Sequence, residues 1–552
     1  MSRAKPNPDQ QAPREWSQHE SRNQSLAPPA KSKAAPPTDE LGVFHPFRWN
    51  LADAFQGTQI FGGTGCGKTT GSGAAIAVPF LRAGLGGLVL TAKSDDAEFW
   101  RAIAAATGRM QDIIEINTTN GSAFNILDYE YRQTGYTRNL VSMLLAAVTT
   151  GGDPHQTVSS DPYWNDAMRE LLMHATDLLV TASVARDKLS IATRHRHYPE
   201  FRLAALHRLI RSAPSSPREL RSSSWRRTSF CWELLTTADA GLGAGVFKRD
   251  EAADIEATID YWTNDFPGLA SKTRSIVVSS LTSKIATLLR SPFRQMFFEG
   301  TSPQFDPAQS FRATKGDRGG KIILVNTPVK VLGEVGRMLQ ILYKTAWTRA
   351  ADRRAGLFSA TGAPPDRPIE PSLTCPAFLW ADESQYFITA EDLLFQQTAR
   401  ASRVATVYLT QNIDNYRGAL GRQDHGVHSL LGNLQTKIFH ANGDTVTNKF
   451  AEETFGRSWI NVTAITKSKG DSVQNGQFSV TSGHSSNSTV QHANTVEARD
   501  ITMLATGGLR FKHKIEAYVF QAGRNWTQAE NSSTPSNAFR YVFEQWQGKS
   551  SP

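Results

Sequence analysis

One stretch constrains the fold of this chain more than any other: residues 61–70 read Phe-Gly-Gly-Thr-Gly-Cys-Gly-Lys-Thr-Thr. It matches the phosphate-binding pattern G-x-x-x-x-G-K-[ST]. Glycines let the backbone pass close to a phosphate, which the N–H groups at the start of a helix then bind. We expect Lys68 to reach the β- and γ-phosphates and the Thr69 hydroxyl to hold Mg²⁺. The expected nucleotide-binding residues are Gly62, Gly63, Thr64, Gly65, Cys66, Gly67, Lys68, Thr69 and Thr70.

The segments around this loop predict an α/β fold with a mainly parallel sheet. Residues 58–61 form a short strand before the loop, and residues 71–81 a helix after it. Further apolar runs, typical of buried parallel strands, alternate with helix candidates. These predicted strands cover residues 87–91, 112–117, 321–326, 377–381, 404–409, 436–441 and 515–520.

The texture of the sequence divides the chain into five parts. Residues 1–42 are polar and are expected to be a disordered tail. The α/β core is expected to cover residues 43–154 and 291–530, and an all-α domain, opening at Asp161-Pro162, is inserted at 155–290. Within the second part of the core, residues 464–496 are rich in Ser, Asn and Gly and predict a mobile loop. Residues 531–552 are expected to be a polar tail.

Composition limits the kind of partner and the cellular compartment that we expect for the protein. The net charge of the 552-residue chain is +9, which permits an anionic partner without requiring one. The three cysteines, Cys66, Cys231 and Cys375, have no metal-binding spacing and favour a reducing compartment. No signal peptide or membrane-spanning run is evident, so we expect a cytoplasmic protein that reaches a membrane only through partners.

Two acids follow the predicted strand at 377–381. Asp382 is expected to position Mg²⁺, and Glu383 to polarise an attacking water. The alternative is an ordinary pair of acids in a solvated turn, which the upstream phosphate loop makes less favourable. The interval from Lys68 to Asp382 exceeds what one compact ATPase core needs, which supports an insertion.

Polar groups beside the next strand are further candidates. Gln411 ends the strand at 404–409, where it could sense the γ-phosphate or orient water, or be a plain strand-end residue. Arg400 and Arg403 precede that strand and are candidates for an arginine that acts on a neighbouring subunit. In the helical insertion, Arg218, Arg221, Arg226 and Arg227 surround Trp225 and predict either a DNA or partner contact or a solvated basic loop.

Taken in order, these motifs resemble the type IV secretion coupling proteins of bacterial conjugation (the TraG/TraD type), within the FtsK–HerA group of RecA-like P-loop ATPases. The resemblance covers roughly residues 45–530. Its other pieces are Val78-Pro79, Lys93, 124–127, 161–164, 272–275, 320–323, Thr410-Gln411, 433–439 and 504–508.

The resemblance implies a RecA-like motor that uses ATP and Mg²⁺ and works as a homo-oligomeric ring, a hexamer. It implies single-stranded DNA in the ring channel, a relaxase or other secreted substrate on the all-α domain, and contact with the secretion channel. It places the second-motif acids at Asp382 and Glu383, the sensing glutamine at Gln411 and the trans-acting arginine at Arg400. The expected function is therefore DNA translocation coupled to secretion.

The chain departs from the family in two places. The family has an amino-terminal transmembrane hairpin where this chain has a polar tail, so we expect any association with the inner membrane to be peripheral and through partners. Around Lys93 the chain reads Thr-Ala-Lys-Ser-Asp where the family has Asp-Pro-Lys-Gly-Glu. Two other functions remain open: a soluble FtsK–HerA-type DNA motor in repair, segregation or defence, and a non-hydrolytic, nucleotide-gated recruitment platform.

Overall fold

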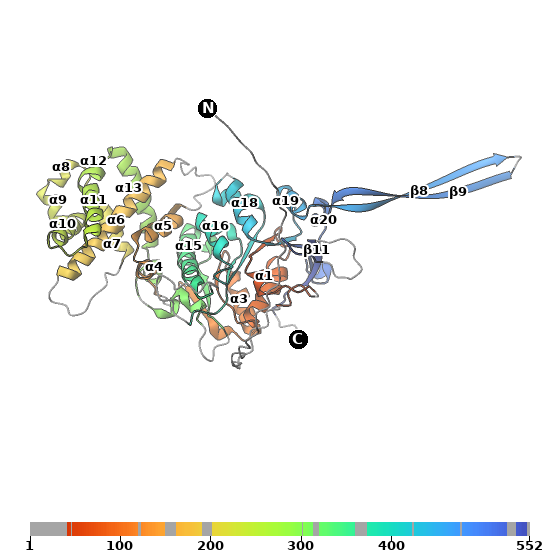
Figure 1. Cartoon of the computed structure of the whole chain (residues 1–552), viewed down its shortest axis with the longest axis horizontal. Helices are drawn as coiled ribbons and strands as arrows, with labels where there is room; N and C mark the ends of the chain where they lie inside the picture. Colours follow the sequence, from red (N-terminus) through yellow and green to blue (C-terminus); the bar gives the residue numbers. More distant parts are fainter. Residues whose placement is uncertain are drawn as a thin grey trace, which may run out of the picture. The chain divides into compact units, whose positions relative to one another are not determined.

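A nine-stranded sheet organises the computed structural model of this chain, in the order β11-β10-β7-β1-β6-β5-β2-β4-β3 (Figure 1). All pairs among β1 to β7 are parallel, whereas β10 runs antiparallel to both β7 and β11. The strands are β1 (Thr58–Phe61), β2 (Gly86–Leu90), β3 (Ile113–Asn117), β4 (Ile322–Asn326), β5 (Ala377–Ala381), β6 (Val404–Thr410), β7 (Thr436–His440), β10 (Lys514–Gln521) and β11 (Ala538–Glu544).

The structure describes residues 41–45, 47–119, 123–149, 162–189, 201–300, 302–312, 319–358, 372–421, 424–474, 477–526 and 537–548. All of them lie in one unit that begins at Asp39. Residues 1–40 of the tail expected at 1–42, the Asp161 helix cap and parts of the expected carboxy-terminal tail lie outside the described residues.

The sheet is buried on both faces because alternate side chains of each strand enter different hydrophobic cores. In β2, Leu88 and Leu90 join one core and Val89 joins the other. The same alternation holds in β4, where Ile322 and Ile323 lie in opposite cores. Continuous apolar runs, rather than alternating ones, are therefore the correct signal for these strands.

Helices cover both faces. Residues of α2 (Ala74–Arg82) and α3 (Asp95–Ala106) belong to the core that contains Val89. The other core takes residues of α15 (Val329–Arg353), α16 (Ala390–Thr398), α17 (Ile413–Leu420), α18 (Asp424–Asn433) and α19 (Thr445–Phe455). Shorter elements are α1 (Leu51–Ala54), η2 (Met110–Asp112), η4 (Pro303–Phe305), η5 (Pro307–Ser310), η6 (Ala355–Phe358), α20 (Ala498–Thr502) and η8 (Leu509–Phe511).

Between β3 and β4 every regular element among the described residues is a helix. The set comprises α4 (Ile126–Thr134), α5 (Thr137–Thr149), α6 (Pro162–Leu189), α7 (Leu203–Arg211), α8 (Pro217–Leu220), α9 (Ser223–Thr228), α10 (Phe230–Gly243), α11 (Arg249–Asp260), η3 (Tyr261–Asp265), α12 (Phe266–Gly268), α13 (Ser271–Leu288) and α14 (Phe293–Phe298), besides η4 and η5. Helix α6 contacts α5, α7, α10, α11 and α13. The predicted helical insertion is thus built around α6, while its boundaries at 155 and 290 stay a prediction.

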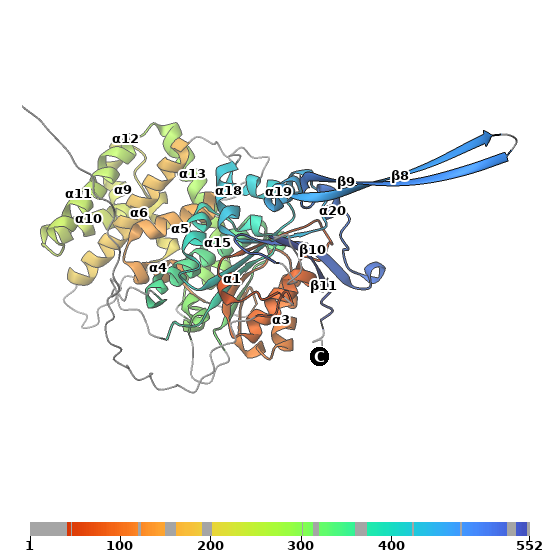
Figure 2. The ribbon, with the colours of Figure 1, turned by 45° about the vertical axis from the view of Figure 1, so that its right-hand side comes forward.

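The expected loop at 464–496 is wrong. These residues form most of β8 (Arg457–Gln474) and β9 (Gln477–Asn494), an antiparallel pair separate from the main sheet (Figure 2). The polar composition suggested a loop, but recurring Thr, Val and Ile favour extended pairing. Trp459 and Val490, two apolar side chains of this ribbon, are 67% and 58% exposed. They therefore give no pattern of buried residues from which these strands could be predicted.

The expected polar tail at 531–552 is wrong in its described part. Strand β11 pairs along its whole length with β10, and Phe543 is buried in the same core as Phe44 and Trp49 from the start of the fold. The Phe44 and Phe543 rings lie 6.2 Å apart. Just beyond β11, the backbone N–H of Trp546 donates a hydrogen bond to the backbone carbonyl of Thr70 at 2.8 Å. The carboxy-terminal segment therefore supports the phosphate loop.

Among the described residues, no helix has the length and apolar character needed to cross a bilayer.

Candidate active site

The predicted phosphate loop connects β1 to a helical segment formed by η1 (Thr69–Gly73) and α2. Gly67 has a φ of +87°, and a Cβ atom there would lie 2.4 Å from Cδ1 of Ile515 in β10. Glycine is required at this position for both reasons. Lys68 is buried, and its Nζ donates to the Gly62 and Gly63 carbonyls at 2.7 and 3.0 Å. Thr64 and Gly65 are exposed at the tip of the loop.

A second contact joins the loop to the predicted metal-binding acid. Asp382 follows β5 directly, and its Oδ2 accepts a hydrogen bond from the Thr69 hydroxyl at 2.7 Å. Because β5 and β1 both lie beside β6 and run parallel to it, their carboxyl ends meet at one edge. A hydroxyl and one carboxylate are oxygen ligands of the kind that Mg²⁺ takes together with phosphates and water. In the described part of the chain no cluster of three His, Cys, Asp or Glu side chains offers another metal site.

Glu383 lies in a strained turn at the same edge. Its backbone is left-handed, with φ and ψ both at 49°, a conformation that costs free energy for a non-glycine residue and is frequent at functional sites. Its Oε1 accepts from Gln411 Nε2 at 3.0 Å, and its Oε2 accepts from Gln385 Nε2 at 2.9 Å. Lys93 Nζ lies 3.6 Å from Oε1. The two predicted residues Glu383 and Gln411 are therefore in direct contact.

These neighbours set the protonation state of Glu383. Burial by itself would raise the pKa of this carboxyl group. The hydrogen bonds from Gln385 and Gln411, together with the charges of Lys93 and Lys68, outweigh burial and lower the pKa. Glu383 is consequently ionised at neutral pH, in the state needed to accept a hydrogen bond from water.

Two residues of this arrangement were not predicted from the sequence. Gln385 links Glu383 to β6, since its Oε1 also accepts from the Thr410 hydroxyl at 2.9 Å. Its place two residues after Glu383 is the only available signal. His440, at the end of β7, lies 2.7 Å from the Ser72 hydroxyl through Nε2. Burial and the charge of Lys68 lower the pKa of His440 to about 3, so this neutral ring supports the first turn after the loop.

The turn after β2 brings Lys93 to the site. Asp96 Oδ2 accepts from the backbone N–H groups of Ala92 and Lys93 at 2.7 and 2.8 Å, which fixes this turn. Burial and the charge of Asp382 raise the pKa of Asp96 to about 7. The pKa of Lys93 rises despite burial because of the acids around it, Asp382 first among them. Lys93 thus contributes a positive charge at the sheet edge.

Arg400 is not part of this arrangement. It lies before the first residue of β6, whereas Thr410 and Gln411 lie at the other end of that seven-residue strand, about 23 Å away. Its side chain is exposed and makes no hydrogen bond or ion pair with the described residues. Arg403 differs, because its guanidinium lies 4.3 Å from the centre of the Phe358 ring.

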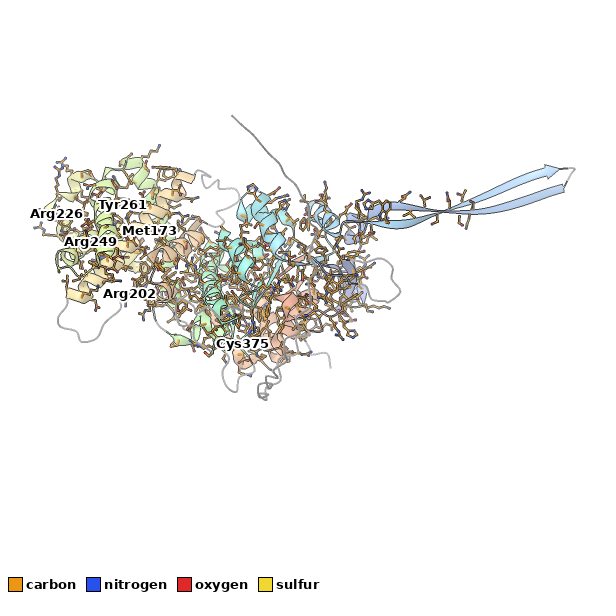
Figure 3. All side chains as sticks on the ribbon, viewed as in Figure 1. Met173, Arg202, Arg226, Arg249, Tyr261 and Cys375 are labelled. Carbon is orange, nitrogen blue, oxygen red and sulfur yellow. The ribbon has the colours of Figure 1, made fainter. Side chains whose placement is uncertain are left out.

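The predicted basic segment of the insertion forms α8 and α9. Arg218, Arg221, Arg226 and Arg227 are all exposed, and Figure 3 shows Arg226 at the edge of the helical insertion. Arg226 also stacks on Trp232 at 4.3 Å and donates to the Leu220 carbonyl. Trp225 is half-buried and packs edge-on against Trp232 at 6.0 Å, so it is partly an internal residue.

No model of a protein family and no curated protein sequence matches this chain. Solved structures match nearly all of it. The unbound monoclinic form of the bacterial conjugative coupling protein TrwBdeltaN70 is 14% identical, with coverage of 94% of this chain and 91% of that protein, at a TM-score of 0.52. This chain has the fold of a conjugative coupling protein.

Two further structures of the coupling protein TrwB match the chain in the same way. The complex of TrwB with ADP and Mg²⁺ is 14% identical over 94% of this chain and 90% of that one, at a TM-score of 0.51. The complex with the non-hydrolysable GTP analogue GDPNP is also 14% identical, over 94% and 91%, at 0.50. The predicted α/β fold with a mainly parallel sheet is confirmed.

Proposed function

We propose that this protein is an ATPase of the conjugative coupling type, which moves DNA and links a relaxase–DNA substrate to a type IV secretion channel. The observation that carries the proposal is the convergence at one sheet edge. There, Thr69 contacts Asp382 at 2.7 Å and Gln411 contacts Glu383 at 3.0 Å. Coupling-protein structures of the same fold that contain ADP with Mg²⁺ or GDPNP support a nucleotide at this edge.

The residues of this chain divide the chemistry among them. The loop N–H groups and Lys68 bind the phosphates, and Thr69 and Asp382 hold Mg²⁺, which offsets the negative charge of the β- and γ-phosphates. Ionised Glu383 accepts a hydrogen bond from the attacking water and so orients it. Gln385, Gln411 and Lys93 keep the Glu383 carboxylate in place, and we expect Gln411 also to sense the γ-phosphate.

We also propose that the complete site needs a neighbouring subunit. A strand length of about 23 Å separates Arg400 from the site edge of its own chain, too far for one side chain to span. An exposed arginine on the opposite edge suits a ring, a homo-oligomer of hexameric type, in which Arg400 reaches the next subunit's phosphates. Such a ring would surround single-stranded DNA, with peripheral attachment to the inner membrane through the secretion channel.

The experiment that tests this function is hydrolysis of ATP by Glu383→Gln. The variant keeps the side-chain shape but loses the carboxylate charge. We expect ATP binding in the presence of Mg²⁺ to persist and the turnover number to fall about 10³-fold, or roughly 4 kcal/mol of transition-state stabilisation. Single-stranded DNA is expected to stimulate the wild-type protein only.

Two matched variants make the result specific. Lys68→Ala is expected to weaken ATP binding itself, whereas Glu453→Gln, which changes an exposed glutamate of α19, should leave turnover unchanged. Turnover of Glu383→Gln within threefold of the wild type would exclude the proposed role of Glu383. If single-stranded DNA does not change the turnover number of the wild-type protein, the proposed DNA translocation is excluded.

A further inference from the structure

A pocket in the helical insertion has no role in the ATPase chemistry. Its volume is about 470 Å³, in the range of ligand-binding pockets. One wall is a face of α6, where Tyr163, Asp166, Glu170 and His174 recur at helical spacing. The other wall comes from η3, α12 and α13, including Tyr261.

The walls are held together independently of any ligand. The rings of His174 and Tyr261 stack with centroids 4.0 Å apart, and Trp262 Nε1 donates to the His174 carbonyl at 3.2 Å. The π-helical turn η3 supplies Tyr261 and Trp262, and such turns are frequent at functional sites. The pocket is therefore preformed.

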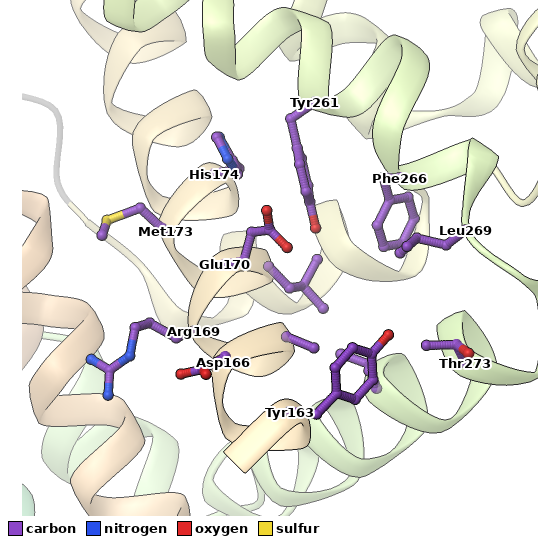
Figure 4. A pocket seen from close by; sticks show the side chains of 13 residues that line it. Tyr163, Asp166, Arg169, Glu170, Met173, His174, Tyr261, Phe266, Leu269 and Thr273 are labelled. Carbon is purple, nitrogen blue, oxygen red and sulfur yellow. The ribbon is translucent and has the colours of Figure 1, made fainter. Parts of the chain in front are cut away.

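The pocket combines aromatic rings with negative charge. Figure 4 shows the Glu170 carboxylate beside the Tyr261 hydroxyl, with Asp166 one helical turn before it and Tyr163 at the far end of the pocket, while Arg169 extends away from these rings. Neither Asp166 nor Glu170 forms an ion pair with a residue that the structure describes. The charges of Glu170 and Asp265, after burial, contribute to a raised pKa of the Tyr261 hydroxyl, and burial keeps His174 neutral. This local negative charge contrasts with the net charge of +9.

Apolar surface continues beyond the cavity. Tyr163 and Leu269 line the pocket and remain 52% and 37% exposed, although both are large apolar side chains. Exposed apolar side chains beside a pocket give a bound polypeptide a surface on which to pack. Phosphate would be repelled by the carboxylates, so DNA does not suit this surface.

We propose that this pocket binds an arginine or lysine side chain of a partner polypeptide, whose apolar neighbours pack on Tyr163 and Leu269. The cation would lie against the exposed ring of Tyr163 and pair with Glu170, which combines cation–π attraction with a charge-assisted hydrogen bond. The inference rests on the proposed function in one respect: the partner would be the protein cargo that the helical insertion receives.

The test is selection of a random 12-residue peptide library on the full-length protein. We expect enrichment of peptides with Arg or Lys next to aliphatic or aromatic residues. Fluorescence polarisation should then show that Asp166→Asn/Glu170→Gln weakens the best peptide about tenfold. The control Asp239→Asn/Glu256→Gln makes the same charge change at exposed acids outside the pocket and should not alter its affinity.

Each other outcome overturns the proposal. These outcomes are no enriched sequence, enrichment of acidic peptides, equal binding by the pocket variant, or equal loss in the control. Stronger binding of a peptide of residues 215–227 of this chain would indicate a second copy as the occupant instead. DNA-stimulated hydrolysis, measured on the same preparations, separates the two proposals, because peptide binding needs no ATP turnover.

Discussion

The carboxyl edge of the main sheet and the surface of the helical insertion use charge in opposite ways. At the sheet edge, charged groups are buried and joined to one another: Glu383 is 3% exposed and accepts hydrogen bonds from two glutamines. On the insertion, Arg218, Arg221 and Arg227 are exposed and make no ion pair with the described residues. Glu170, which lines its pocket, likewise makes no ion pair with a residue that the structure describes.

The difference indicates which region is already organised for its function and which becomes ordered only when a partner binds. Groups fixed before the reaction need no reorganisation when charge develops, so changes at the sheet edge should be costly. Exposed, unpaired charges interact through solvent and salt and act only when a partner arrives. We therefore expect large effects of substitution in the first region and small, salt-dependent effects in the second.

Arg400 tests this comparison most severely. It is exposed, and yet we expect the largest effect, a loss of turnover, from its substitution. Arg400→Ala should lower the turnover number about 10³-fold, since an arginine supplied by a neighbour stabilises charge that grows in the transition state. ATP binding should stay near normal. Mixing Arg400→Ala with Glu383→Gln subunits should restore some hydrolysis, because one interface then contains both intact groups.

The mixing measurement needs proof that mixed rings form, for which light scattering and differently tagged subunits suffice. If mixed rings are as inactive as rings of either variant alone, Arg400 does not act on the site of a neighbouring subunit. Full activity of the dilute wild-type monomer would remove the shared site altogether.

Phe543 tests whether the carboxy-terminal strand belongs to the support of the sheet edge. It is 2% exposed and packs on Tyr541 at 4.8 Å and near His440 at 5.9 Å. Phe543→Ala should destabilise the core by about 3 kcal/mol, seen as a lower denaturation midpoint. Val542→Ala, at a site 44% exposed, should change the midpoint little. Equal midpoints for both variants would show that β11 is dispensable.

Gln385 sharpens the comparison inside the site. Gln385→Leu removes one of the two hydrogen bonds that hold the Glu383 carboxylate and should lower turnover about tenfold. Because that bond stabilises the ionised form, its loss should raise the pKa of Glu383 and move the acid limb of the pH–rate profile to higher pH. Gln397→Leu, at an exposed position of α16, is the matched control. An unshifted acid limb would count against a positioning role.

The basic segment should give the smallest effect. Replacing Arg218, Arg221, Arg226 and Arg227 with alanine should weaken single-stranded DNA binding severalfold at low salt and flatten its salt dependence, because each phosphate contact contributes about 0.7 to the slope. The corresponding quadruple lysine variant should keep the slope. An unchanged slope in the alanine variant would show that these arginines do not contact phosphate.

The sequence predicts those parts of the fold whose signal is local. Runs such as Leu88-Val89-Leu90 are apolar throughout because both faces of the sheet are buried, and glycines mark the loop that must lie close to Ile515. The contact of Thr69 with Asp382 follows from the parallel order of β1, β6 and β5. The catalytic roles of Glu383, Gln411 and Arg400 stay predictions.

The missed elements depend on partners far away in the chain. Strand β11 alternates buried Phe543 with exposed neighbours at the edge of the sheet, and only its pairing with β10 makes it a strand. The β8–β9 ribbon is rich in polar residues and its described apolar side chains Trp459 and Val490 are exposed, so its composition resembles that of a loop. Gln385 is one polar residue in a turn until the neighbouring Thr410 and Glu383 give it a role.

The hydrogen bond from Trp546 to Thr70 has a consequence for biosynthesis. Trp546 lies several hundred residues after Thr70 in the chain, so the ribosome makes the phosphate loop well before the segment that supports it. At 5–20 residues per second, about half a minute to a minute and a half separates the two. During this interval the phosphate loop of a nascent chain lacks the hydrogen bond from Trp546, so its full support can form only after that residue has been made.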